Sequence, residues 1–151
     1  MAKTMFNQAV KEVKLIRLNY GAPKEFELRE RVKTRDMNGK TITIDNLIVS
    51  NQVKKQKNDK GEYVTVMTKD GTKPIYQPLV YVGFDDTKYF VTKSQMLIRQ
   101  LERLSNKTLV YYEEKDVKVD GVIGCKVLIS GESVKYADGQ DYEQIVFNDA
   151  E

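Results

Sequence analysis

Residues 92–106 read TKSQMLIRQLERLSN, and we work outward from this stretch because it predicts a helix. Spacings of four and three residues place Leu97, Leu101 and Leu104 on one helical face. Thr92 is the predicted N-cap, because its hydroxyl can accept from a backbone N–H that the first turn leaves unpaired. Asn106 is a suitable end, since asparagine tolerates the left-handed backbone. We therefore expect a helix whose three leucines are buried.

The chain before this helix is predicted to form strands. Residues 25–35, EFELRERVKTR, alternate so that Phe26, Leu28 and Val32 face one way, which is typical of a half-buried strand. Asn38-Gly39 favours a tight turn, so residues 40–49 are expected to pair with that strand as a hairpin. Residues 13–20 are also expected to be a strand.

The residues just before the helix predict an edge or loop segment followed by a hairpin. Pro74 and Pro78 place residues 74–78 at a sheet edge or in a loop, because proline donates no ladder hydrogen bond. Residues 79–84 and 88–92 predict a hairpin around Asp85-Asp86 that leads into the helix.

Beyond the helix, two further hairpins are predicted. Residues 108–119 and 122–130 are expected to pair across Asp120-Gly121, and a small hairpin is expected at Asp138-Gly139. The fold class is therefore predicted to be mainly β with one principal helix.

A chain of 151 residues favours one folded domain. We divide it into an N-terminal arm (1–12), a main domain (13–137) and an acidic C-terminal tail (138–151). The arm carries Phe6 and Val10, and we expect it to contact another subunit and give a homo-oligomer; a frayed terminus is the alternative.

Composition narrows the class of protein. A hydrophobic fraction of 40% and a charged fraction of 31% are typical of a soluble globular protein. No apolar run reaches the roughly 20 residues of a membrane span, and the first residues lack a secretory apolar region. The expectation is a cytoplasmic protein with no membrane partner.

The net charge of +3 is unevenly distributed. Residues 1–76 contain 16 Lys/Arg and 9 Asp/Glu, whereas residues 138–151 contain five acids and no base. A basic half with an acidic end favours a polyanionic partner, although scattered surface charge is the ordinary alternative.

The chain has few of the residues that catalysis most often requires. The chain has no histidine, which is the commonest general base and metal ligand, and one cysteine cannot build a thiolate metal site. Cys125 lies in an apolar stretch, which favours a buried, inert thiol. Glu113 and Glu114 would point to opposite faces of a strand. We expect no catalytic residue, metal or cofactor, and a protein that is not an enzyme.

A binding surface remains. Single-stranded nucleic acid is bound by aromatic platforms along a cationic groove, and the chain has nine tyrosines, several beside basic residues. Most tyrosines will be ordinary strand packing, and of the consecutive Tyr111 and Tyr112 only one can face away from the core. The candidate contacts are the basic Arg31, Lys33, Arg35, Lys54, Lys55 and Lys57 and the stacking Tyr63, Tyr89, Tyr111 and Tyr112.

With three strands, a helix and a final strand pair, the chain resembles the OB-fold single-stranded-DNA-binding proteins of Gram-positive conjugative plasmids and phages. The resemblance covers about residues 13–130. The chain differs from the common bacterial single-strand-binding proteins, because it lacks their tryptophans and their acidic tip ending in Pro-Phe. The resemblance implies a partly open five-stranded OB-like barrel that binds a single strand in conjugation or phage replication, with DNA favoured over RNA as the ligand.

Two other classes of function stay open at this point. The first is a structural or assembly β-barrel of a phage virion with no nucleic-acid ligand. The second is a small nuclease accessory protein or regulator.

Overall fold

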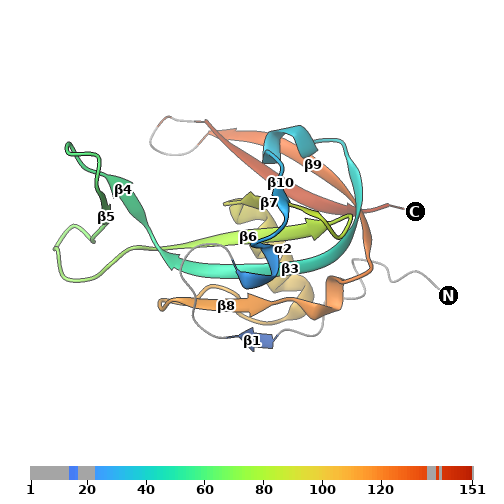
Figure 1. Ribbon diagram of the computed structural model, residues 1–151, viewed down its shortest axis with the longest axis horizontal. Coiled ribbons are helices and arrows are strands. Elements are labelled where there is room, and N and C mark those ends of the chain that lie inside the picture. Colours follow the sequence, from blue (N-terminus) through green and yellow to red (C-terminus); the bar gives the residue numbers. More distant parts are fainter. Residues whose placement is uncertain (1–13, 17–22, 136–138, 140, 151) are drawn as a thin grey trace.

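The computed structural model describes residues 14–16, 23–135, 139 and 141–150, and within them the protein is mainly β with one α-helix (Figure 1). This confirms the predicted fold class at that level. The strands are β1 (Lys14–Ile16), β2 (Glu30–Arg31), β3 (Thr41–Val53), β4 (Lys55–Lys57), β5 (Tyr63–Thr65), β6 (Tyr76–Phe84), β7 (Lys88–Thr92), β8 (Lys115–Lys118), β9 (Lys126–Lys135) and β10 (Asp141–Asp149). The helix is α2 (Gln95–Ser105), and short 3-10 turns are η1 (Lys24–Phe26), η2 (Thr34–Met37) and η3 (Asp120–Val122).

Strand β3 is the centre of the sheet. Its first residues, 41–43, pair antiparallel with β9, and its longer second part pairs with β6 on one edge and β8 on the other. The register with β6 shifts between Ile44 and Asn46, and in the same region the other edge of β3 changes its partner from β9 to β8. The strands run β1-β8-β3-β6-β7-β2, with β9 and β10 branching from β3, and the described sheet does not close into a ring.

The helix packs on this sheet through the predicted face. Leu97 and Leu101 are fully buried, whereas Leu104 is only partly buried against the same core. Asn106 adopts the left-handed conformation with φ 53°, as its position at the helix end predicts.

The predicted N-cap is wrong by two residues. Thr92 is the last residue of β7, and the cap is Ser94, whose Oγ accepts a hydrogen bond from the Leu97 N–H at 3.1 Å. Because β7 pairs with β6 as far as Thr92, the helix can begin only after the strand has ended.

The predicted strand over residues 25–35 is also wrong. The only strand there is β2, and it pairs in parallel with β7 rather than forming a hairpin with β3. Phe26 is fully buried but Leu28 is fully exposed, so the alternating residues do not share a buried face. The turn at Gly39 does exist, with φ 79°, and leads into β3.

Pairing after the helix differs from the prediction in one respect. Segments 108–119 and 122–130 do not pair with each other: β8 pairs with β1 and β3, and β9 pairs with β3 and β10. The turn η3 between them separates the two strands.

Two predicted hairpins are present. Asp85 and Asp86, with φ of 55° and 57°, form the turn between β6 and β7. Strands β9 and β10 form the other, so residues 141–149, expected within an acidic tail, are a sheet strand with Ile145 and Phe147 buried. The N-terminal arm over residues 1–12 lies outside the described residues.

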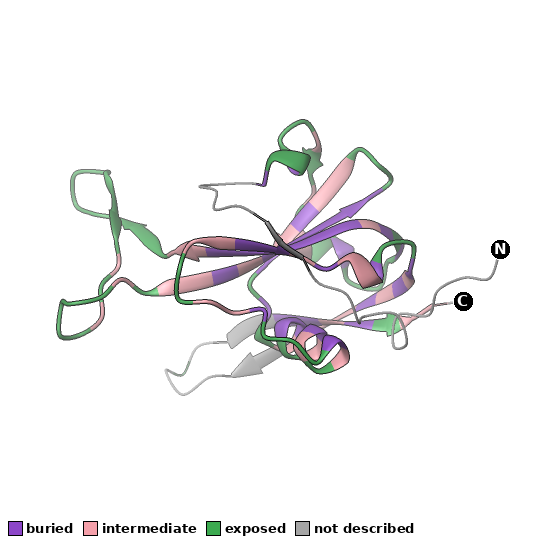
Figure 2. Cartoon of the chain, turned by 90° about the horizontal axis from the view of Figure 1, so that it is seen from below, coloured by how far each residue is buried: buried purple, intermediate pink, exposed green. Residues whose placement is uncertain are grey.

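Beyond the register pair Val53–Tyr76, the chain leaves the body as a projection, residues 54–75, that includes the β4–β5 pair (Figure 1). Nearly all of the projection is exposed (Figure 2). Pro78 lies just inside the body, past the last β6–β7 pair, so β3 alone flanks it, in keeping with the predicted edge position.

Candidate nucleic-acid interface

The base of the projection is held by its own backbone. Lys54 N–H donates to the Ile75 carbonyl at 2.8 Å, and Val66 N–H donates to the Lys54 carbonyl at 2.9 Å. The Ile75 N–H donates in turn to the Val66 carbonyl at 2.8 Å. Three passes of the chain are thereby tied together where the projection meets β3 and β6.

Two side chains shape the turns at its far end. The Asn58 Oδ1 accepts from the N–H groups of Lys60 and Glu62 at 2.9 and 3.0 Å. Asp70 accepts from the Thr68 hydroxyl and from both the hydroxyl and N–H of Thr72. These hydrogen bonds lower the pKa of Asp70, and the bond from the Thr68 hydroxyl has the largest effect. The charged carboxylate therefore stabilises the turn.

The projection concentrates positive charge beside an exposed ring. The predicted Lys54, Lys55 and Lys57 are all exposed there, and the Lys57 Nζ lies 5.4 Å from the centroid of the Tyr63 ring. Tyr63 is 67% exposed, so ring surface not covered by Lys57 is accessible to a ligand. This part of the predicted site stays together in space.

Sequence reasoning missed part of this surface. Lys69 and Lys73 are exposed on the same projection, after β5 rather than in the basic loop before it. The excess of lysine continues after β5 and could have indicated these two residues. That they lie on the same projection depends on how its three passes of chain pair with one another, which the sequence does not reveal. Exposed apolar side chains accompany the lysines: Val64, Met67 and Ile75.

Tyr111 and Tyr112 lie close to the root of the projection. The fully buried Asn51 of β3 donates through Nδ2 to the carbonyls of Leu109 at 3.0 Å and Lys115 at 3.3 Å, and its Oδ1 accepts from the Tyr111 N–H at 3.0 Å. Asn51 thus fixes the segment that carries both tyrosines to the end of β3.

The two tyrosines face different surroundings, as predicted. Tyr112 is 86% exposed. Tyr111 packs against the main core, and the Lys115 Nζ lies 5.0 Å from its ring centroid. Tyr112 is therefore the accessible platform, and the prediction that Tyr111 stacks on a ligand loses its support.

Arg31, Lys33 and Arg35 form a second basic area. With Thr34 they line an open hollow of about 570 Å³ on the β2–η2 segment. Thr34 anchors that segment by donating its hydroxyl to the Val91 carbonyl. These cations come from β2 and η2, not from a hairpin with β3, and no described contact joins them to the lysines of the projection. The basic residues of the predicted site therefore come from two separate segments of the chain.

Tyr89 is not a free platform. Its ring centroid lies 5.3 Å from that of Phe26 and 6.1 Å from that of Tyr81, in a small cluster on the sheet face opposite the main core. Phe26, from η1, covers both tyrosines, which is why Tyr89 is half-buried. The prediction treated Phe26 as a strand residue and had no means of placing it here.

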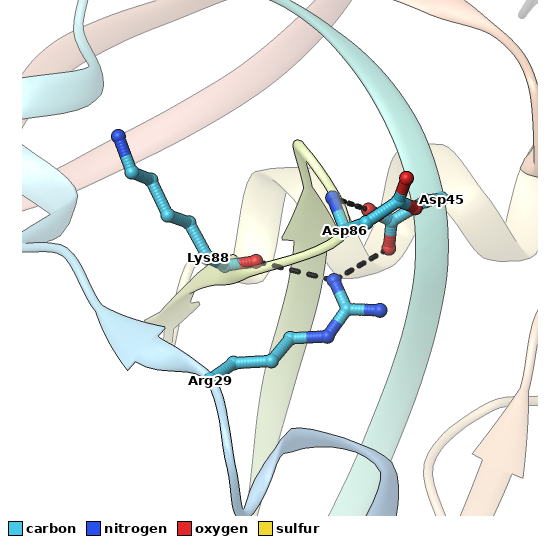
Figure 3. Close-up of polar contacts among 4 residues, drawn as sticks. All are labelled: Arg29, Asp45, Asp86 and Lys88. Carbon is cyan, nitrogen blue, oxygen red and sulfur yellow. Dashed lines mark hydrogen bonds and ion pairs between the residues drawn. The ribbon is translucent and has the colours of Figure 1, made fainter.

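An ionic network fixes the residues beside this cluster (Figure 3). Arg29 Nη1 donates to Asp45 Oδ1 at 2.7 Å and to the Lys88 carbonyl at 3.3 Å, and the Asp86 N–H donates to Asp45 Oδ2 at 2.7 Å. Asp45 therefore joins the chain after η1 to the β6–β7 turn.

Other titratable groups of the described residues are dispersed. No group of three or more Asp, Glu or Cys side chains there is arranged to hold a metal ion. Cys125 is buried, and burial raises its pKa. No described helix is long and apolar enough to cross a membrane.

Comparison with known proteins adds no relative. No protein-family model matches the chain, and neither the curated proteins nor the solved structures gave a match.

Proposed function

We propose that the protein binds single-stranded nucleic acid, DNA in preference to RNA, and catalyses no reaction. The observation that carries the proposal is the projection of residues 54–75, on which Lys57 lies over the exposed Tyr63 ring and further lysines are exposed. Lysines neutralise phosphates without reading sequence, and an exposed ring can stack on an unpaired base.

Two features favour a single strand over a duplex as the ligand. Tyr63 and Tyr112 present ring surface to solvent, and a base is available for stacking only when it is unpaired. Asn51 holds the Tyr112 segment against the end of β3, three residues before the projection begins at Lys54. Cationic and aromatic contacts are thus available at neighbouring points along one strand of the ligand.

The proposal extends to an OB-like architecture. Strands β3, β6 and β7, then α2, then β9 and β10 follow the order of an OB-fold, with β3 shared between β6 and β9. In this assignment the final pair is β9–β10, and the projection is the connection between the first two strands, where OB-folds bind oligonucleotides. The open sheet and the added β8 distinguish this chain from a closed barrel.

The test is a fluorescence-anisotropy titration with single- and double-stranded oligonucleotides at two salt concentrations. Replacing Lys54, Lys55 and Lys57 with Ala should weaken binding to every sequence. The slope of log affinity against log salt should fall by about 0.7 for each phosphate that the variant no longer neutralises. The matched control replaces Lys40, Lys93 and Lys107, which are exposed on the body, and should change the slope little.

Two outcomes would contradict the proposal. One is a wild-type protein that binds no oligonucleotide at low salt. The other is an equal loss of affinity in both triple variants. The alternative of a structural or assembly protein would then be favoured. In that case the exposed Val64, Met67 and Ile75 would contact another protein chain.

A further inference from the structure

Phe26 occupies a slot made by other aromatic rings. Its ring is fully buried and stacks on Tyr81, with centroids 5.7 Å apart and planes 29° apart, while Tyr89 lies 5.3 Å away. The Arg29 guanidinium carbon lies 5.4 Å from the Phe26 centroid. A planar ring between tyrosines and a guanidinium is also the arrangement in which proteins hold an unpaired base.

The floor of the slot is built for a close fit. A Cβ placed on Gly83 would lie 2.6 Å from Arg29 Nη1, 2.6 Å from Asp45 Oδ1 and 3.0 Å from Phe26 Cε1. Glycine at this position of β6 therefore allows both the Phe26 ring and the Arg29–Asp45 ion pair to lie against the sheet. Figure 3 shows the ion pair.

The segment that delivers Phe26 is attached to the body by few contacts. The N–H groups of Phe26, Glu27 and Arg29 all donate to carbonyls of the segment itself, and the next described backbone bond to the body is from Glu30 to Thr87. Leu28 is fully exposed. The described attachments of residues 23–29 to the body are therefore the buried Pro23, the Phe26 ring and the Arg29 side chain.

The segment also resembles a nucleotide strand in the order of its charges and its ring. Phe26 is flanked by Glu25 and Glu27, both exposed, so a ring lies between two anions as a base lies between two phosphates. Arg31 follows, opposite Tyr89 in the β2–β7 pairing, and supplies a cation at the edge of the slot.

On the basis of the proposed function, we infer that the Tyr81–Tyr89 slot is a second site for one unpaired nucleobase, and that Phe26 is its built-in occupant. A single strand that reaches the slot displaces Phe26 and stacks on the tyrosines. The segment thereby competes with the ligand and lowers the affinity of the resting protein.

The experiment compares variants by the same anisotropy titration, using a labelled oligothymidine of about 20 nucleotides, which exceeds the site size of one OB domain. Phe26→Ala empties the slot, and Asp45→Asn weakens the ion pair that seats Arg29 without altering the sequence of the segment or the floor of the slot. Leu28→Ala is the matched control within the same segment. Phe26→Ala should bind roughly tenfold tighter, the gain of one stacked base, Asp45→Asn should bind tighter by a smaller factor, and Leu28→Ala should match the wild type. Adding Tyr81→Leu to Phe26→Ala should remove the gain.

The outcomes separate the two proposals. If the wild type binds and both slot variants bind no tighter while remaining folded, the slot is overturned and the proposed function stands. If neither the wild type nor the slot variants bind, both are overturned. Tighter binding by Phe26→Ala that survives the Tyr81→Leu change also overturns the slot, because the gain then lies elsewhere. If both slot variants fail to fold, Phe26 is a required part of the core and the inference is overturned.

Discussion

The side chain of Asn51 illustrates how one buried residue determines which of two adjacent tyrosines meets the solvent. Because its three hydrogen bonds hold residues 109–115, Tyr111 turns to the core and Tyr112 turns outward. We predict that Tyr112→Ala weakens oligonucleotide binding by about 1–3 kcal/mol and leaves the melting temperature unchanged. Tyr111→Ala should lower the melting temperature instead.

Anisotropy and thermal melting of the two variants measure these effects separately. Tyr112→Phe is the control, because it keeps the ring and should keep the affinity. Equal losses of affinity in Tyr111→Ala and Tyr112→Ala, without a difference in melting, would contradict the assignment of Tyr112 as the platform.

Asp116 provides a prediction for pH. It is 2% exposed, its Oδ1 accepts from the Ser50 hydroxyl at 2.6 Å, and burial raises its pKa. A carboxyl whose folded pKa is raised binds protons more tightly in the native state, so stability falls as pH rises from the unfolded pKa through the folded one. Asp116→Asn keeps an acceptor for Ser50 without the charge.

We therefore expect Asp116→Asn to melt at a higher temperature than the wild type at pH 7, with the difference shrinking in acid below the unfolded pKa. Melts at several pH values measure this. Asp59→Asn, on the exposed projection, is the control. A variant destabilised equally at every pH would show that the carboxylate is held by contacts that outweigh its burial.

At the scale of elements, α2 is tied to β10 through its own cap. Besides capping Leu97, Ser94 Oγ donates to the Ile145 carbonyl at 2.7 Å and accepts from the Ile145 N–H at 2.9 Å. Ser94→Ala should cost about 2 kcal/mol of unfolding free energy, the upper end for a helix cap, because three hydrogen bonds disappear in a buried place. Urea denaturation measures it; Lys93→Ala, one residue earlier and exposed, should be neutral. A similar cost for both would argue against the cap.

The same elements show what the sequence can predict. The helix and the β6–β7 hairpin depend on local signals, the leucine spacing and the Asp85-Asp86 turn, and both were predicted. The partners of β8 and β9 depend on contacts between distant residues, so local turn signals paired these strands wrongly. Residues 25–35 alternate as a strand does, but Phe26 is buried by rings from β6 and β7 that no local pattern reveals.

The candidate site was predictable to a similar degree. Lysines are costly to bury, so Lys54, Lys55 and Lys57 were placed on the surface correctly from residue type alone. Tyrosine suits both a core and a binding surface, so residue type could not distinguish the exposed Tyr63 from the half-buried Tyr89.

For the whole molecule, the projection and the body are separable in principle. Val53 and Tyr76 are register partners, so an Asn-Gly turn joining them in place of residues 54–75 should close a two-residue hairpin. We expect this variant to keep the fold, since residues 54–65 bury no side chain, and to lose most of its affinity for single strands. Circular dichroism and anisotropy measure the two effects. A folded variant with wild-type affinity would place the ligand elsewhere on the body.

The position of β3 in the sheet also has a consequence for synthesis on the ribosome. Both edges of this strand are completed only by β6, β8 and β9, and its pairing with β9 joins Thr41 to Leu128. At about 5–20 residues per second, several seconds pass between the emergence of Leu47, Ile48 and Val49 and that of their last partners. During that interval a nascent chain carries an incomplete apolar strand, which is a template for pairing between neighbouring chains on one message. A chain truncated before Lys115, where β8 begins, would leave that edge of the strand incomplete permanently.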